Sequence, residues 1–167
     1  MRNAFTIIEL LIVTAIIGIG ISGGIAAYGT LGQAKQLDYE SQKIADFIAL
    51  YQKKSQTPPA CSGGSEFQGY QLNFSATNND YDAYVCCGAS QTALPTSCTT
   101  AIESINISSS NVAIQSTGYV IFKPIGAGSN INPSGYTLTL KNTASSQCVS
   151  ITFGLNGLFT VQDPVSC

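Results

Sequence analysis

A long apolar run near the N-terminus constrains this chain more than any other feature. Residues 5–32 contain one charged residue, Glu9, and the next charge along the chain is Lys35. About 20 apolar residues are enough to span the hydrocarbon core of a bilayer. Residues 5–27 are therefore predicted to form one membrane-spanning helix. Arg2 precedes the run and no other basic residue occurs before Lys35, which predicts a cytoplasmic N-terminus and an exported remainder.

The composition excludes several functional classes. Only 10% of the 167 residues are charged, and the mean hydropathy of +0.19 allows one span at most. Seven Lys and Arg residues against nine Asp and Glu residues give no basic excess for binding nucleic acid. The chain has no histidine, the commonest general base and metal ligand. No nucleophile–base pair, phosphate loop or carboxylate pair is visible, so we predict a non-enzymatic protein without cofactor or metal.

An amphipathic helix is predicted to follow the apolar run. Five apolar residues recur there at spacings of three, four and seven, which is typical of a helix with one buried face: Leu37, Ile44, Phe47, Ile48 and Tyr51. No proline occurs from Phe5 to Thr57, so both segments are predicted to form one helix of about 50 residues and about 75 Å. The proline pair at 58–59 should end it.

The remainder, residues 58–167, is predicted to form a β-rich head. Its composition changes to Ser, Thr, Asn and Gly with short β-branched or aromatic runs. The strict alternation of residues 136–140 is typical of a strand with one buried face. Residues 89–111 are expected to be a loop with one short strand at 105–107. The predicted strands are 69–74, 84–87, 118–123, 135–141, 148–153 and 158–162, the last three forming an antiparallel meander.

Six cysteines all follow the apolar run: Cys61, Cys86, Cys87, Cys98, Cys148 and Cys167. An even number confined to the exported part predicts disulfides formed in an oxidising compartment. Zinc is the alternative, but the chain lacks a Cys-x-x-Cys pair and histidine. Fifteen connectivities are possible. Adjacent Cys86 and Cys87 should each pair elsewhere, and a Cys148–Cys167 bridge is favoured because it would tie the C-terminal end to the strands.

Three weaker patterns have a functional and a structural interpretation. Asn78, Asp80 and Asp82 resemble the start of a calcium loop, but Ala89 replaces the closing glutamate and a solvated turn is favoured. Asn73 and Asn106 begin glycosylation sequons that depend on the host. Five tyrosines could line an adhesive surface, although core or cross-strand packing is the first expectation: Tyr70, Tyr81, Tyr84, Tyr119 and Tyr136.

Glu9 distinguishes this apolar run from an ordinary anchor. A carboxylate at the centre of a membrane helix costs about 2.5 to 3.5 kcal/mol and needs a partner, unless it lies near the wet membrane surface. Residues 1–12 read MRNAFTIIELLI. This segment resembles the type III signal of type IV prepilins, with its small residue at Ala4, its first mature residue at Phe5 and its glutamate at Glu9. The sequence departs from that pattern in a short leader and in alanine where glycine is more usual.

The resemblance implies a processing and assembly route. Residues 1–4 would be a leader, cleaved after Ala4 by a prepilin peptidase that also N-methylates Phe5. Residues 5–32 would be the transmembrane and assembly helix, in which Glu9 pairs with the N-terminal amine of a neighbouring subunit. The implied partners are other pilins, a membrane assembly platform and the cytoplasmic membrane. Where the family often has proline, this run has four glycines that either soften the helix or allow close packing: Gly18, Gly20, Gly23 and Gly24.

A fainter resemblance covers the C-terminal part. Residues 119–161 are similar to the β-sheet region of H-type minor pseudopilins and related minor pilins. Some of those minor pilins bind DNA through C-terminal arginines, whereas this chain has no arginine after Arg2. DNA binding by that route is therefore not expected.

Together these features predict an α+β, pilin-like fold, with a long N-terminal helix packed on an antiparallel, disulfide-stapled head. The predicted function is a structural subunit of a type IV pilus or pilus-like filament, held in the cytoplasmic membrane before assembly with its head outside. One alternative is a minor pseudopilin of a type II secretion system. Another is a secreted binding protein with a signal peptide cut near Ala27, against which Glu9 argues. An enzyme on a membrane stalk would need a site that the sequence does not show.

Overall fold

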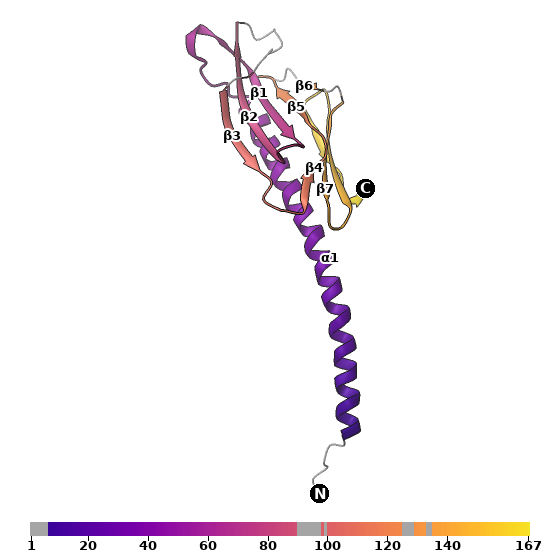
Figure 1. Ribbon diagram of the computed structural model, residues 1–167. Coiled ribbons are helices and arrows are strands. Elements are labelled where there is room, and N and C mark those ends of the chain that lie inside the picture. The colour runs from indigo at the N-terminus through magenta and orange to yellow at the C-terminus, as the bar shows by residue number, and fades with distance from the viewer. Residues whose placement is uncertain (1–6, 90–97, 99, 125–128, 133–134) are drawn as a thin grey trace.

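A helix that projects from a β-rich head dominates the computed structural model (Figure 1). The structure describes residues 7–89, 98, 100–124, 129–132 and 135–167, and it describes no side chains for 21–31, 100 and 129–132. Helix α1 (Ile7–Lys54) runs for 48 residues and is continuous through the glycine-rich segment. A short 3-10 turn (Ser62–Gly64) follows the proline pair and leads into the strands.

The membrane-spanning helix expected over residues 5–27 is not found as such. Within the described part of the chain, no helix is both long enough and apolar enough to cross a membrane. Residues 5 and 6 and the side chains of residues 21–31 lie outside the described set.

The strands form two antiparallel sheets. Sheet A has the order β3 (Thr100–Asn106), β2 (Asp80–Gly88), β1 (Glu66–Ser75), β5 (Gly118–Phe122) and β6 (Ser129–Asn132). Sheet B has the order β10 (Val165–Ser166), β8 (Gln147–Phe153), β7 (Thr137–Asn142) and β4 (Val112–Ile114), and β9 (Phe159–Val161) pairs with β8. The expected C-terminal meander is present as β7, β8 and β9.

Several edge strands of these sheets were not predicted from the sequence. The segment 89–111, expected to be mostly loop, contains the seven-residue strand β3, and β4, β6 and β10 were not predicted. Residues 101–104 of β3 are all exposed, so this edge strand shows no alternation of buried and exposed positions. Strands β4 and β10 have only three and two residues, too few to show a period.

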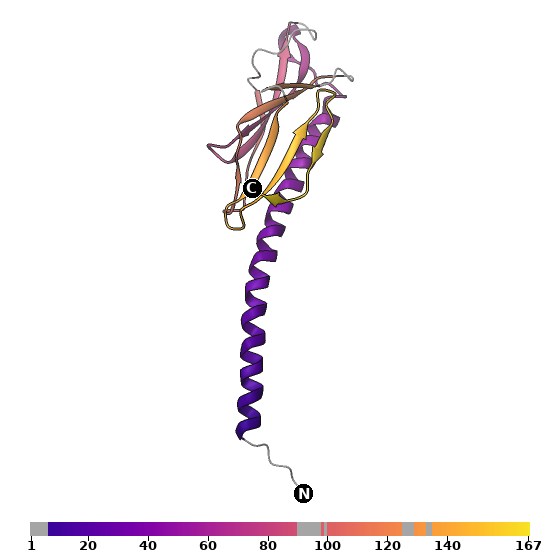
Figure 2. The same ribbon diagram turned by 90° about the vertical axis from the view of Figure 1, so that its right-hand side faces the viewer.

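The core lies where the second half of α1 packs against both sheets. The turned view shows this part of the helix beside the C-terminal strands (Figure 2). The predicted stripe is buried along its whole length: Leu37, Ile44, Phe47, Ile48 and Tyr51. Leu138 and Leu140 of β7 are fully buried and alternate with half-buried threonines, as predicted. The ring of Phe47 meets that of Tyr81 on β2 at 4.9 Å between centroids. This contact joins α1 to sheet A.

Candidate functional site

The first half of α1 is an apolar surface that the rest of the described chain leaves uncovered. Every residue from 7 to 20 is exposed, and the large apolar side chains there are 46 to 82% exposed. In Figure 1 this part of the helix extends away from the head. Exposed apolar surfaces of this extent mark contacts with membranes or other proteins. The side chains concerned are Ile7, Ile8, Leu10, Leu11, Ile12, Val13, Ile16, Ile17 and Ile19.

Glu9 is the one charged residue of this surface and lies in the first turn of α1. The hydroxyl of Thr14 donates to the carbonyls of Leu10 (3.1 Å) and Leu11 (3.0 Å), so this polar group is satisfied within the helix. A carboxylate can only accept hydrogen bonds, and in an apolar environment it needs a cation or donors from outside the helix. Ala4 and Phe5, the predicted cleavage and methylation positions, lie outside the described residues.

A buried glutamate fixes α1 to the head. Glu40 is 1% exposed, and its Oε1 accepts hydrogen bonds from the Ser108 hydroxyl (2.9 Å) and the Ser109 backbone N–H (3.2 Å). The ammonium of Lys43 lies 3.9 Å from the other carboxylate oxygen. Glu40 was not among the functional residues predicted from the sequence. The sequence does contain a signal for its burial. Glu40 lies three residues after Leu37 and four before Ile44, and this spacing places it on the buried stripe of the helix.

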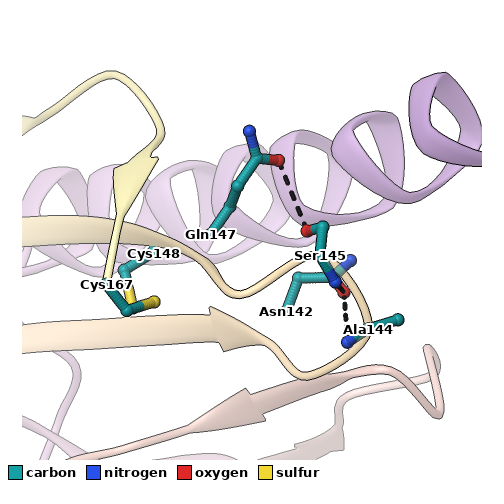
Figure 3. Close-up of a disulfide and its surroundings, with 6 residues drawn as sticks. All are labelled: Asn142, Ala144, Ser145, Gln147, Cys148 and Cys167. Atoms are coloured by element: carbon teal, nitrogen blue, oxygen red, sulfur yellow. Dashed lines mark hydrogen bonds between the residues drawn. A yellow bond between two sulfur atoms is a disulfide. The ribbon is translucent and has the colours of Figure 1, made fainter.

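A buried asparagine holds the proximal end of the head, the end where α1 enters it. Asn142 is fully buried, and its Nδ2 donates to the Gln33 carbonyl at 2.8 Å. Its Oδ1 accepts from the backbone N–H groups of Ala144 (2.9 Å) and Ser145 (3.0 Å) in the β7–β8 turn (Figure 3). One side chain therefore ties this turn to α1.

All six cysteines form disulfides: Cys61–Cys87, Cys86–Cys98 and Cys148–Cys167. The adjacent Cys86 and Cys87 each pair elsewhere, and the third bridge is the pair that the sequence favoured. It joins β8 to the residue after β10 (Figure 3), where the Cys167 N–H also donates to the Ser146 carbonyl at 3.0 Å. Because the thiols are consumed in disulfides, the zinc alternative is wrong.

The Asn-rich turn before β2 has a structural role. Asn79 adopts the left-handed conformation with φ 57°. Its Oδ1 accepts from the Ile114 N–H (2.8 Å) and its Nδ2 donates to the Val112 carbonyl (2.9 Å), so it supports β4.

Across the described residues, no group of three or more His, Cys, Asp or Glu side chains could hold a metal ion.

The first expectation for the five tyrosines, packing in the core, is confirmed for three of them, and the alternative of an adhesive surface is wrong for those three. Tyr70, Tyr81 and Tyr136 are at most 7% exposed and pack in the core. Tyr84 and Tyr119 are half-buried. The large apolar area of a tyrosine ring explains this outcome, because burying it in the core stabilises the fold.

Comparison with known proteins bears on the N-terminal segment. Residues 1–25 match the family model described as the prokaryotic N-terminal methylation motif. No curated protein and no solved structure matches the chain. The likeness of residues 119–161 to H-type minor pseudopilins therefore has no support beyond the sequence resemblance. The chain therefore carries a prokaryotic N-terminal methylation motif, and this match supports the resemblance to type IV pilins and pseudopilins.

Proposed function

We propose that the protein is a structural subunit of a type IV pilus or pilus-like filament. The exposed apolar half of α1, headed by the methylation motif, carries this proposal. A surface of nine large apolar side chains is costly in water and is stabilised when membrane lipid or other helices cover it. A single helix that serves both environments fits a subunit stored in a membrane and then moved into a filament core.

Glu9 supports polymerisation over simple anchoring. Cleavage between Ala4 and Phe5 frees an α-amine, and N-methylation leaves that amine cationic. In a filament core the Glu9 carboxylate of one subunit would pair with the Phe5 amine of its neighbour, so that only correctly registered subunits neutralise both charges. Removing one partner of a buried ion pair is strongly destabilising. An ordinary membrane anchor has no such need for a carboxylate.

The head would remain outside the membrane and form the filament surface. Residues 5–32 would hold the precursor in the cytoplasmic membrane, while residues 33–57 join that segment to the head, residues 58–167. Prepilin peptidase, an assembly platform and other pilins would be the partners. The three disulfides suit a head exposed to an oxidising compartment.

Intact-mass analysis of the native protein tests this proposal. We expect a mature chain that begins at N-methyl-Phe5 and is recovered in sheared surface filaments. A chain that begins at Tyr28 would indicate an ordinary signal peptide and overturn the proposal. A chain that keeps Met1 and stays in the membrane would indicate a plain anchor.

A further inference from the structure

Strand β3 leaves one edge of sheet A open. It is the terminal strand of that sheet, and within the described part of the chain only β2 forms backbone hydrogen bonds with it. Figure 1 shows β3 as the outermost strand on its side of the head. Residues 101–104 are all exposed, and the Ile102 side chain is 45% exposed. The backbone N–H and C=O groups on the side of β3 away from β2, its free edge, can therefore pair with another strand.

The sequence of β3 does little to block such pairing. Soluble proteins commonly protect an edge strand with proline, with lysine or with a covering segment. Residues 100–106 read TAIESIN and contain neither proline nor a basic residue. The one irregularity in the register with β2 falls between residues 101 and 103. From Glu103 to Asn106 the pairing is regular, so this half of β3 offers a regular template for a further strand.

The surroundings of the free edge are acidic. Asp82 of β2 pairs directly with Ser104 of β3, and Asp80 lies two residues away on the same face of the sheet. Glu103 is exposed, and its Oε2 accepts a hydrogen bond from the Tyr51 hydroxyl of α1, on the opposite face. Strands β1 to β3 carry four carboxylates and no lysine or arginine: Glu66, Asp80, Asp82 and Glu103. A strand added at this edge would therefore meet negative charge on both faces.

Asp82 lies within reach of an added strand. Neighbouring strands are about 4.8 Å apart, so a residue opposite Ser104 on the added strand would lie about 10 Å from Asp82. Ser104 is exposed and small, and a long lysine or arginine side chain can cross it. The Tyr84 hydroxyl donates a hydrogen bond to the Asp82 carboxylate, which helps to hold that group in position. A second basic residue two positions along the partner would approach Asp80 in the same way.

The charge argues against a second copy of β3 as the occupant of this edge. Two β3 strands side by side would bring the carboxylates of both copies together. Neither copy has a basic residue on strands β1 to β3 to offset them. Like charges that face each other across an interface suppress the wrong partner. The acidic edge instead favours a partner that carries positive charge.

We propose that the free edge of β3 binds an extended, basic segment of another protein by β-strand addition. Backbone hydrogen bonds along residues 101–106 supply affinity, and side chains at alternate positions of the partner supply specificity. Lysine or arginine residues at those positions pair with Asp82 and Asp80 on one face, and Glu103 accepts a further basic side chain on the other. Ile102 adds an apolar contact. This contact involves the head alone and goes beyond the proposed function.

Binding of a synthetic peptide to the full-length chain in detergent tests the inference. The probe is a fluorescent heptapeptide of alternating arginine and valine, and its anisotropy gives the Kd. Asp82→Asn with Glu103→Gln keeps the hydrogen-bond acceptors but removes two charges, and should raise the Kd about fivefold. Asp38→Asn with Asp163→Asn removes two exposed charges away from sheet A, and this matched control should leave the Kd unchanged.

Two further measurements separate strand addition from simple charge attraction. The same peptide methylated at every backbone nitrogen keeps its charge but has no backbone donors, and should bind at least about tenfold more weakly. Hydrogen–deuterium exchange should slow over residues 101–106 when the unmodified peptide binds. Equal affinity for the methylated peptide, an unchanged Kd in the Asp82/Glu103 variant, no binding at about 1 mM or protection of another segment alone would overturn the proposal. A photo-crosslinker in place of Ile102 that joins two copies through β3 would assign the edge to a second copy, and would overturn it as well.

Discussion

Glu9 lies in the first turn of a helix whose next 25 residues carry no charge. Replacing it with leucine removes the one charge of this apolar surface, and a carboxylate within a membrane helix is unfavourable. Glu9→Leu should therefore insert and be processed at least as well as wild type. It should nevertheless yield at least tenfold fewer filaments, because the Phe5 amine of the neighbouring subunit loses its counter-ion. The amount of processed variant in membranes measures insertion and cleavage, and the amount in sheared filaments measures assembly.

The control for Glu9 is Ile16→Leu, which conserves volume on the same exposed surface. It should assemble normally. Normal filament yield from Glu9→Leu would remove the ion-pairing argument, whereas a loss of processing in that variant would assign Glu9 to peptidase recognition.

At the scale of elements, the contact between α1 and sheet A contains two buried tyrosines with different hydrogen bonding. The Tyr51 hydroxyl donates to Glu103 Oε2 at 2.9 Å, whereas the Tyr81 hydroxyl is buried without a hydrogen-bond partner in the described structure. Tyr51→Phe should lower the free energy of unfolding by about 1.5 kcal/mol, because the bond to a charged acceptor is lost. Tyr81→Phe should leave it unchanged or raise it by about 1 kcal/mol. Urea unfolding of the full chain in detergent at pH 7 compares them.

Tyr51 and Tyr81 should also make the free energy of unfolding depend on pH in the alkaline range. Burial is the largest cause that raises the pKa of both phenols above the usual value of 10, and nearby Glu103 adds to it for each. A phenol whose folded pKa is raised contributes stability that is complete below about pH 10 and is lost as the pH rises further. Each phenylalanine variant should therefore show a shallower loss of stability between pH 10 and pH 11 than wild type. Identical slopes would contradict this.

How far the sequence predicts these elements depends on the range of the interactions that form them. The stripe from Leu37 to Tyr51 and the alternation in β7 are local periodic signals, and both describe the core correctly. Asn142 could not be found in this way, because its partner Gln33 lies 109 residues away in the chain. The exposed edge strand β3 shows no alternation of apolar and polar residues. Its hydrogen bonds to β2 hold it in place, and it buries no face of its own along residues 101–104.

At the scale of the whole molecule, three disulfides close segments with sequence separations of 26, 12 and 19 residues. Loops of this length each correspond to about 3 kcal/mol of stabilisation in the chain-entropy model. Replacing Cys148 and Cys167 together by serine should therefore lower the melting temperature of the full chain in detergent by about 10 °C, given the usual 2 to 4 °C per kcal/mol for chains of this size. Differential scanning fluorimetry with and without reductant measures it, and free thiols in native protein would contradict the disulfide framework.

The position of this bridge extends the prediction to assembly. Cys167 follows β10, and the bridge fixes β10 to β8 beside the β7–β8 turn, at the proximal end of the head where Asn142 binds α1. The Cys86–Cys98 bridge is instead anchored in β2 of sheet A. Serine variants of the two bridges should thus lose similar thermal stability, yet the Cys148/Cys167 variant should lose more filaments below its melting temperature. If the two variants lose equal thermal stability and equal numbers of filaments, the bridges affect assembly only through the stability of the fold. That result would contradict a specific role of the proximal end of the head in assembly.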